Sequence, residues 1–302
     1  MRERGIVEWL KNPQTRIGID EILKHWAAQE IIVAISRPAN HASPIELLGR
    51  IRRAWGTRLK RSASPEGFAG KPCPWDPPCA RDIFFHEQFR FSANHGLPKP
   101  YVFSMDVERS HLVVRLALFG AGIDYSYAAR EALVEALRFG VSWNKAEAPV
   151  DHTQESSEIR SCEIRPLIPA DISDDCQRLR ISFITPLKLG GEDPANNPST
   201  IIARMARRTG NMLHWMGCGL DANWSEISRL WKQLDYSILE DAPAVIHHNS
   251  RRQNARYDVD GVQMTFDIDG ALAPLIPIIA ASQTCNIGGN ATAGFGRFMI
   301  QL

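Results

Sequence analysis

The sequence predicts an α+β protein of two consecutive domains, because strands and helices follow the same order in each half of the chain. At 302 residues the chain is long enough for two domains that each bury a hydrophobic core. Pro166, Pro169 and the acidic stretch 171–175 separate the two halves and mark the domain boundary. We expect three segments: a helical extension at 1–29, a first domain at 30–168 and a second domain at 169–302.

The first half shows the order strand, helix, strand, strand, helix, strand. A β-branched run at 31–35 predicts the first strand. Ser43 is a favourable N-cap and Pro44 suits the first helical position, so a helix is expected over 44–61. After a largely irregular, proline-rich region at 62–100, we expect strands near 100–104 and 111–119, a helix at 125–138 and a strand near 158–165. This order is ferredoxin-like, with an antiparallel sheet and helices on one face.

The second half repeats this order with one added helix. The expected elements are a strand at 179–185, a helix at 199–216, the added helix at 223–235, strands at 243–250 and 261–268, an apolar helix at 272–281 and a strand at the C-terminus. The two halves share no close sequence repeat, so a duplication would be one of structure alone.

A glycine-rich stretch precedes the final strand. Residues 285–302 read C-N-I-G-G-N-A-T-A-G-F-G-R-F-M-I-Q-L. The glycines are Gly288, Gly289, Gly294 and Gly296. Glycine permits a positive φ and a close approach of the backbone to a ligand, so the stretch predicts a tight loop with exposed amides. Arg297, where loop becomes strand, is suited to hold a phosphate whose other oxygens face those amides.

Two common phosphate-binding motifs are excluded for this loop. The sequence lacks the Lys-Ser/Thr pair that follows the last glycine of a Walker loop. A dinucleotide fingerprint places its glycines between a strand and the following helix, whereas these glycines precede a terminal strand. A glycine-rich hairpin that binds no ligand remains an alternative.

The pattern I-G-G-(x)4-G-F-G-R-F resembles the glycine-rich loop of the RAMP superfamily of CRISPR-associated RNA-binding proteins, and most closely that of the endoribonucleases that cut the CRISPR repeat transcript. Further segments resemble that family in the same order: P-I-E-L-L-G-R-I-R-R-A-W-G at 44–56, C-P-W-D-P-P-C-A-R-D-I-F-F-H at 73–86 and I-S-F-I-T-P-L-K-L-G-G at 181–191. The family's loop often begins with a histidine and carries a lysine after the first glycine, where this chain has Asn286 and Gly289. The resemblance implies two tandem ferredoxin-like (RRM-like) domains and an RNA partner.

One face of the helix expected at 44–61 is basic. Ile45, Leu48, Ile51, Trp55 and Leu59 fall on one side of this helix, and Arg50, Arg53, Arg58 and Arg61 fall on the other. Glu46 is the only acid in the helix, and like charges at this spacing repel one another. The stripe therefore predicts an anionic partner such as phosphate, and a solvated surface is the alternative.

Further candidate RNA ligands lie in the second half. Arg204, Arg207 and Arg208 occupy adjoining faces of the helix at 199–216. The segment I-H-H-N-S-R-R contributes His247, Arg251 and Arg252. On a strand, His247 and Arg251 would share one face and Arg252 would lie on the other. One of these faces should be buried, so only one set can meet RNA.

The chain carries no motif of a metalloprotease, serine hydrolase or nucleotide kinase. The resemblance implies RNA cleavage without metal or cofactor, in which a 2′-hydroxyl attacks its adjacent phosphate and leaves a 2′,3′-cyclic phosphate and a 5′-hydroxyl. In that family a histidine on or just before the first helix usually takes part in the cleavage, and His41 stands at the matching place in this sequence. Arg37 and Arg50 are the nearest cations to stabilise charge on the phosphate. If His41 is inert, arginines alone supply that stabilisation.

Composition limits the other possibilities. The net charge is +1 and the pI near 7.7, so basicity that binds RNA must be local. Six cysteines without a C-x-x-C pattern predict a reduced, cytoplasmic protein, and the spacing of Cys73 and Cys79 disfavours zinc. The charged N-terminus is not that of a signal peptide, and no apolar run approaches 18 residues.

Three functions are compatible with these features. The first is a metal-independent endoribonuclease that processes CRISPR repeat stem-loops and keeps the guide RNA within an effector complex with other subunits. The second is a non-catalytic RAMP subunit that binds guide RNA as a scaffold. The third is an unrelated α+β enzyme that uses the glycine loop for a phosphorylated small molecule. Cleavage of repeat RNA separates the first from the second, and salt-sensitive RNA binding counts against the third.

Overall fold

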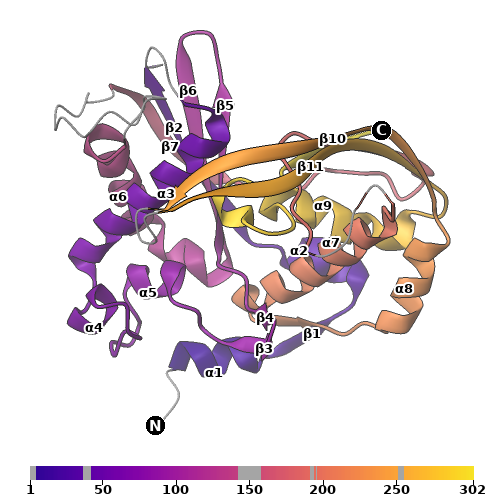
Figure 1. The fold of residues 1–302 in the computed structure, drawn as a ribbon. Helices are drawn as coiled ribbons and strands as arrows, with labels where there is room; N and C mark the ends of the chain where they lie inside the picture. The colour runs from indigo at the N-terminus through magenta and orange to yellow at the C-terminus, as the bar shows by residue number, and fades with distance from the viewer. Residues whose placement is uncertain (1–4, 37–41, 142–157, 191–193, 195, 251–254) are drawn as a thin grey trace. The chain divides into compact units, whose positions relative to one another are not determined.

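The computed structural model describes residues 5–36, 42–141, 158–190, 194, 196–250 and 255–302, without the side chains of 246–259 (Figure 1). It consists of two compact units. The first unit comprises Met1–Gln14, Ala27–Leu167 and His214–Gly217, and the second comprises Thr15–Trp26, Ile168–Leu213 and Cys218–Leu302. The expected extension at 1–29 is therefore divided between the two units.

The first unit contains a four-stranded antiparallel sheet with the order β5 (Tyr101–Val107), β6 (His111–Phe119), β2 (Ala28–Ser36), β7 (Ile159–Pro166). Helices α3 (Pro44–Leu59) and α6 (Ser126–Phe139) pack against each other, α3 against β5, and α6 against β2 and β7. Numbered along the motif, the strand order is 2-3-1-4, which is that of a ferredoxin-like fold. The predicted fold class is confirmed for this half.

The start of α3 follows from its first residues. The Ser43 amide donates a hydrogen bond to the Glu46 carboxylate at 3.1 Å, and Pro44 occupies the first turn. Inside the unit, Trp55 is fully buried and donates from Nε1 to the Ala129 carbonyl oxygen at 3.0 Å. Its ring lies 5.1 Å from that of Phe84, measured between centroids, within an aromatic core.

The remaining elements of the first unit are short. They are α1 (Gly5–Lys11), α4 (Pro65–Phe68), α5 (Ala80–Phe85), β3 (Arg90–Ser92) and β4 (His95–Gly96). The largely irregular region is held together by side chains. Buried Asp82 accepts hydrogen bonds from the Cys73 amide at 2.8 Å and from Gln88 Nε2 at 3.3 Å. The first bond satisfies a backbone amide that has no partner in a sheet or helix, and the second ties another side chain of the region to Asp82.

The short segment His214–Gly217 completes the first unit. Trp215 is 1% exposed and donates from Nε1 to the Pro98 carbonyl oxygen at 2.7 Å. Gly120, at φ +49°, lies so close to the Trp215 backbone that a Cβ atom would overlap its carbonyl oxygen. The first unit therefore depends on residues far along the chain.

The second unit has the same fold. Its sheet has the order β10 (Asp235–Ser250), β11 (Ala255–Asp269), β8 (Arg178–Phe183), β12 (Phe298–Gln301), and every pairing is antiparallel. Helices α7 (Ser199–Met212) and α9 (Ile276–Cys285) pack together, and α8 (Trp224–Lys232) is the added helix expected from the sequence. The motif order is again 2-3-1-4, so the predicted fold class is confirmed here too.

Part of the expected N-terminal extension belongs to this second unit. Strand β1 (Thr15–Ile17) pairs in parallel with β9 (Cys218–Leu220), and α2 (Ile22–His25) packs against α9. Next to α2, Trp26 donates from Nε1 to Thr284 Oγ1 at 3.0 Å. These contacts give residues 15–26 a structural role that the sequence did not indicate.

The β10–β11 hairpin is longer than the expected strands at 243–250 and 261–268. Its strands contain 16 and 15 residues, and Figure 1 shows them as two long orange arrows. Within β11, only Thr265–Asp269 pairs with β8. An isolated bridge joins Leu187 to Val262. Pro243 and Gly261 are poor strand formers, so the sequence predicted shorter strands. In the structure, both residues are paired within the hairpin, and the strands continue past them.

Asp267 on β11 joins this strand to β8 through two arginines. Its carboxylate is 1% exposed and accepts hydrogen bonds from Arg178 Nη2 at 2.6 Å and Arg180 Nε at 2.7 Å. These bonds hold the pKa of Asp267 far below its usual range. The arginines themselves remain exposed, so they cover the carboxylate while their outer donors face solvent.

We expect Asp267→Asn to lower the melting temperature by roughly 2–4 °C at pH 7, because it removes a charged acceptor shared by two guanidinium groups. The folded pKa is depressed, so this stabilisation is present above the unfolded value of about 4 and is lost as the pH falls below it. Thermal unfolding from pH 7 to pH 2 should show the two proteins converge in acid. Asp269→Asn, which loses only a 3.6 Å ion pair to Arg178, is the matched control. A constant difference at every pH would contradict this account.

Candidate nucleic-acid interface

The glycine-rich loop lies between α9 and β12 and needs its glycines for backbone geometry. Gly288, Gly294 and Gly296 have φ values of +81°, +92° and +64°. A Cβ atom on Gly288 would lie 2.5 Å from the Lys188 carbonyl oxygen, and one on Gly296 would overlap the Ile287 carbonyl oxygen. Side chains are disfavoured at these positions by both conformation and space.

The loop is held by the segment after β8. The amide of Gly289 donates to the Lys188 carbonyl oxygen at 2.8 Å, and that of Gly296 donates to the Pro186 carbonyl oxygen at 2.9 Å. Thr185 Oγ1 accepts from the Arg297 amide at 2.9 Å and donates to the Gly294 carbonyl oxygen at 2.7 Å. Two of the glycine amides expected to face a ligand are thus used inside the protein. Gly289 and Asn290 form an exposed tip.

One of the predicted arginines of α7, Arg208, lies at the base of this loop. Arg208 donates from Nε to the carbonyl oxygen of Cys285, the last residue of α9, at 2.9 Å. Its Nη2 atom is buried and has no hydrogen-bond partner among the residues that the structure describes. Burial raises the pKa of the Cys285 thiol, and the Arg208 charge opposes this shift. Arg204 and Arg207 are half-buried on the same helix.

The arginine stripe predicted for a helix at 44–61 divides into two pairs, and Arg61 lies in the 3-10 turn Lys60–Ser62 that follows α3. Arg58 Nη1 lies 3.1 Å from the Glu135 carboxylate on α6, and Arg61 forms an ion pair with the same carboxylate. Glu135 therefore provides an anionic partner that the helix sequence alone did not reveal. Arg50 and Arg53 lie nearer the start of α3, where Arg50 is half-buried and Arg53 is exposed.

The other predicted site residues fall partly outside the described structure. Arg37 and His41 lie in the undescribed segment between β2 and α3. Arg251 and Arg252 lie in the undescribed segment 251–254, and His247 is described only for its backbone in β10. The proximity of Arg37, His41 and Arg50 therefore stays a prediction.

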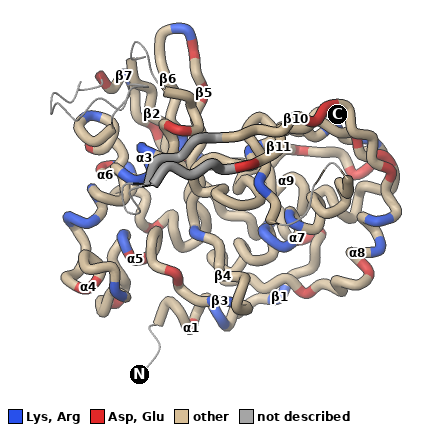
Figure 2. Tube along the Cα trace, in the orientation of Figure 1, with Lys and Arg blue, Asp and Glu red and all other residues tan. Residues whose placement is uncertain are grey.

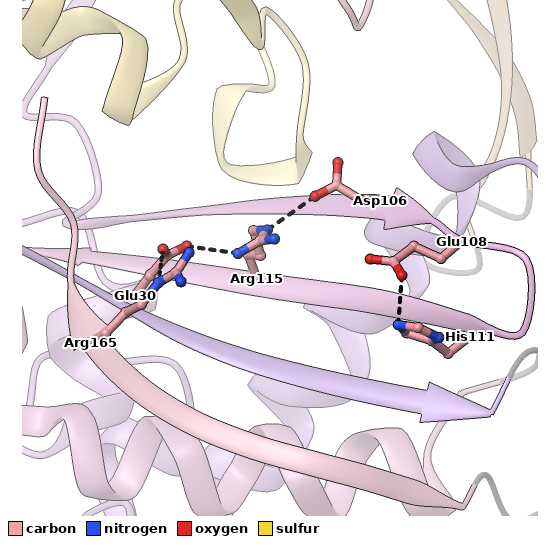
Figure 3. Close-up of polar contacts among 6 residues, drawn as sticks. All are labelled: Glu30, Asp106, Glu108, His111, Arg115 and Arg165. Carbon is pink, nitrogen blue, oxygen red and sulfur yellow. Dashed lines mark hydrogen bonds and ion pairs between the residues drawn. The ribbon is translucent and has the colours of Figure 1, made fainter. Parts of the chain in front are cut away.

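A charged network on the first sheet was missed by the sequence analysis (Figure 3). Glu30 on β2 is 6% exposed and binds Arg165 Nε of β7 at 2.7 Å and Arg115 Nη1 of β6 at 3.4 Å. Arg115 Nε also binds Asp106 of β5 at 3.0 Å, so the network crosses all four strands. The available signal was a lone acid directly before the apolar run 31–35, because a buried charge in a strand requires partners.

Charges of both signs occur along the described chain. Figure 2 shows Lys and Arg positions interspersed with Asp and Glu positions, in keeping with the net charge of +1. Within the residues that the structure covers, no group of three or more His, Cys, Asp or Glu side chains is placed to hold a metal ion. None of the described helices has the length and apolar character needed to cross a membrane.

The chain thus contains two ferredoxin-like folds, with a glycine-rich loop before the last strand of the second. Cas6 proteins share this fold. One Cas6 product complex has a TM-score of 0.55 and 13% identity, with 91% of this chain and 100% of that chain covered. Thermus thermophilus Cas6 has a TM-score of 0.53 and 10% identity over 91% and 99% of the two chains. A second Cas6 product complex has a TM-score of 0.51 and 12% identity over 91% and 100%.

Sequence comparison adds no relative. The sequence matches no family model, and no curated protein matches it. At identities this low, the likeness to Cas6 structures establishes the fold of the chain. The predicted fold class of two ferredoxin-like domains is confirmed.

Proposed function

We propose that the chain is a metal-independent endoribonuclease that binds and cleaves the stem-loop RNA of a CRISPR repeat to give mature guide RNA. The observation that supports this most is the fold shared with Cas6 over 91% of the chain, including product complexes. Arg208, which is bonded at the base of the glycine-rich loop, supplies local basicity in a protein whose net charge is only +1. The protein then retains its product within an effector complex.

The proposed reaction needs three groups. His41 accepts the proton of the 2′-hydroxyl, whose oxygen attacks the adjacent phosphorus. Arg37 and Arg50 stabilise the charge that grows on the phosphate oxygens. The bond from phosphorus to the 5′-oxygen breaks, this oxygen takes up a proton from solvent water, and the products are a 2′,3′-cyclic phosphate and a 5′-hydroxyl.

Further residues are proposed to bind the RNA backbone. They are Arg53, Arg58, Arg61, Arg204, Arg207, Arg208, His247, Arg251, Arg252, Gly288, Gly289, Gly294, Gly296 and Arg297. Arg58 and Arg61 would contact phosphate through donors that their shared bond to Glu135 leaves unused.

The proposal is tested with a repeat hairpin and EDTA. We expect cleavage at one phosphodiester, because the mechanism takes its base and its cations from side chains. The same hairpin with a 2′-deoxynucleotide before the cleaved phosphate should bind equally and remain intact, since it lacks the nucleophile. Salt-sensitive binding without cleavage of the normal hairpin would favour the scaffold function. Absence of salt-sensitive binding would overturn both RNA functions.

A further inference from the structure

Two arginines lie over one aromatic ring in the first unit, and a lysine is bonded to the backbone beside it. Arg52 of α3 places its guanidinium carbon 5.3 Å from the centroid of the Phe85 ring, and Arg81 of α5 places its own at 4.1 Å. Lys99, which precedes β5, donates from Nζ to the carbonyl oxygen of His86, the residue after Phe85. Residues from three separate stretches of sequence therefore converge at one place.

Neighbouring groups fix the positions of these cations. Arg52 donates from Nε to the Tyr101 hydroxyl at 2.8 Å. Gly56, one turn further along α3, makes room for the ring: a Cβ atom there would lie 2.5 Å from Phe85 Cζ and 3.0 Å from Arg81 Nη1. The arrangement is thus built into the fold and does not depend on flexible surface side chains.

The positive charge of this cluster is not balanced by ion pairs. Among the described residues, none of Arg52, Arg81 and Lys99 forms a salt bridge. Of the nearby acids, Glu87 lies 2.9 Å from Arg90 Nε, and Asp82 accepts hydrogen bonds within its own segment. All three cations are half-buried.

This environment is unfavourable for the charges. Burial lowers the pKa of Lys99 to about 8, Arg52 and Arg81 lower it further, and Glu87 and Asp82 oppose the shift. Burial also lowers the pKa of Arg81, and the charge of Arg52 adds to that effect. An anion bound between the three groups would relieve both the repulsion and the lost hydration.

We propose that Arg52, Arg81 and Lys99 form a binding site for one phosphate group. A guanidinium group matches two phosphate oxygens at once, and a tetrahedral anion offers further oxygens to a second guanidinium and to an ammonium. A carboxylate has only two oxygens and a single charge. The phosphate belongs either to the backbone of bound RNA or to a free phosphorylated molecule. The first assignment rests on the proposed function, and the second does not.

The site is tested first with inorganic phosphate. Phosphate at 10 mM should raise the melting temperature of the wild type above that in potassium chloride of equal ionic strength. Arg81→Gln should lose this increase. Arg109→Gln, the same change at an exposed arginine in the β5–β6 turn, should keep it. An equal increase with acetate, an equal increase in Arg81→Gln, or no increase in the wild type would overturn the proposal.

A measurement on the wild type alone guards against misfolding of the variant. Phosphate should move the pKa of Lys99 upward from about 8, as followed by NMR of labelled lysine. An unchanged pKa at saturating phosphate would overturn the site.

The source of the phosphate is tested with repeat hairpin RNA. An RNA affinity about tenfold weaker in Arg81→Gln than in Arg109→Gln would assign the site to RNA phosphate, since one charge-assisted contact is worth about this much. Equal affinities, together with a positive inorganic-phosphate result, would assign it to a free phosphorylated molecule. The inorganic-phosphate result needs no RNA cleavage, so failure of the proposed function and failure of this site are distinguishable.

Discussion

Replacing His41 with alanine is expected to slow the cleavage of repeat RNA by about 10²–10⁴-fold, because the reaction loses the group that accepts the 2′-hydroxyl proton. RNA affinity should stay within about twofold, since the proposed phosphate contacts come from other residues. Single-turnover cleavage in EDTA, with binding measured in parallel on the 2′-deoxy hairpin, separates the two effects.

The pH profile gives a sharper readout of this role. The wild-type rate should rise with pH up to about 6.5, where an ordinary histidine loses its proton, and the variant should lose this rise. His25→Ala, at the exposed end of α2, is the control and should cut at the wild-type rate. Undiminished cleavage by the His41 variant would remove the histidine from the mechanism and leave catalysis to the arginines.

Gly296→Ala is expected to destabilise the second unit by about 3 kcal/mol or more, because it combines a left-handed φ with an overlap between Cβ and the Ile287 carbonyl oxygen. The melting temperature of that unit should fall by roughly 6–12 °C. Calorimetry that resolves the transitions of the two units would measure this fall.

Gly289→Ala is the matched control within the same loop. Gly289 does not have a positive φ, and a Cβ atom there would meet Lys188 Cγ at an ordinary 3.4 Å. Its stability should change by less than about 0.5 kcal/mol, so any loss of RNA affinity would report on the exposed tip itself. If Gly296→Ala melts with the wild type, the loop does not have the tight backbone described above.

Much of the fold could be predicted from local signals. Ser43, Pro44 and Glu46 define the start of α3 by hydrogen bonding that involves only neighbouring residues. The positive φ values of Gly288, Gly294 and Gly296 agree with the tight loop expected from their chemistry. Such features depend on residues close in sequence, and a single sequence carries that information.

Features that depend on distant residues could not be predicted in this way. The pairing of Arg58 and Arg61 with Glu135 requires α3 and α6 to lie side by side. The pairing of β1 with β9 joins residues about 200 positions apart and has no local signal. The cluster of Arg52, Arg81 and Lys99 is likewise assembled only by the fold.

The first unit is built from segments that are far apart in the sequence, and this affects its folding during synthesis. When residue 167 leaves the ribosome, all four strands of its sheet have been synthesised. Trp215, which packs beside Gly120 and donates to the Pro98 carbonyl oxygen, has not. Dozens of further residues must be translated before this buried ring arrives. The nascent chain therefore exposes an unfinished apolar surface for some seconds, a period in which a chaperone would find a binding site.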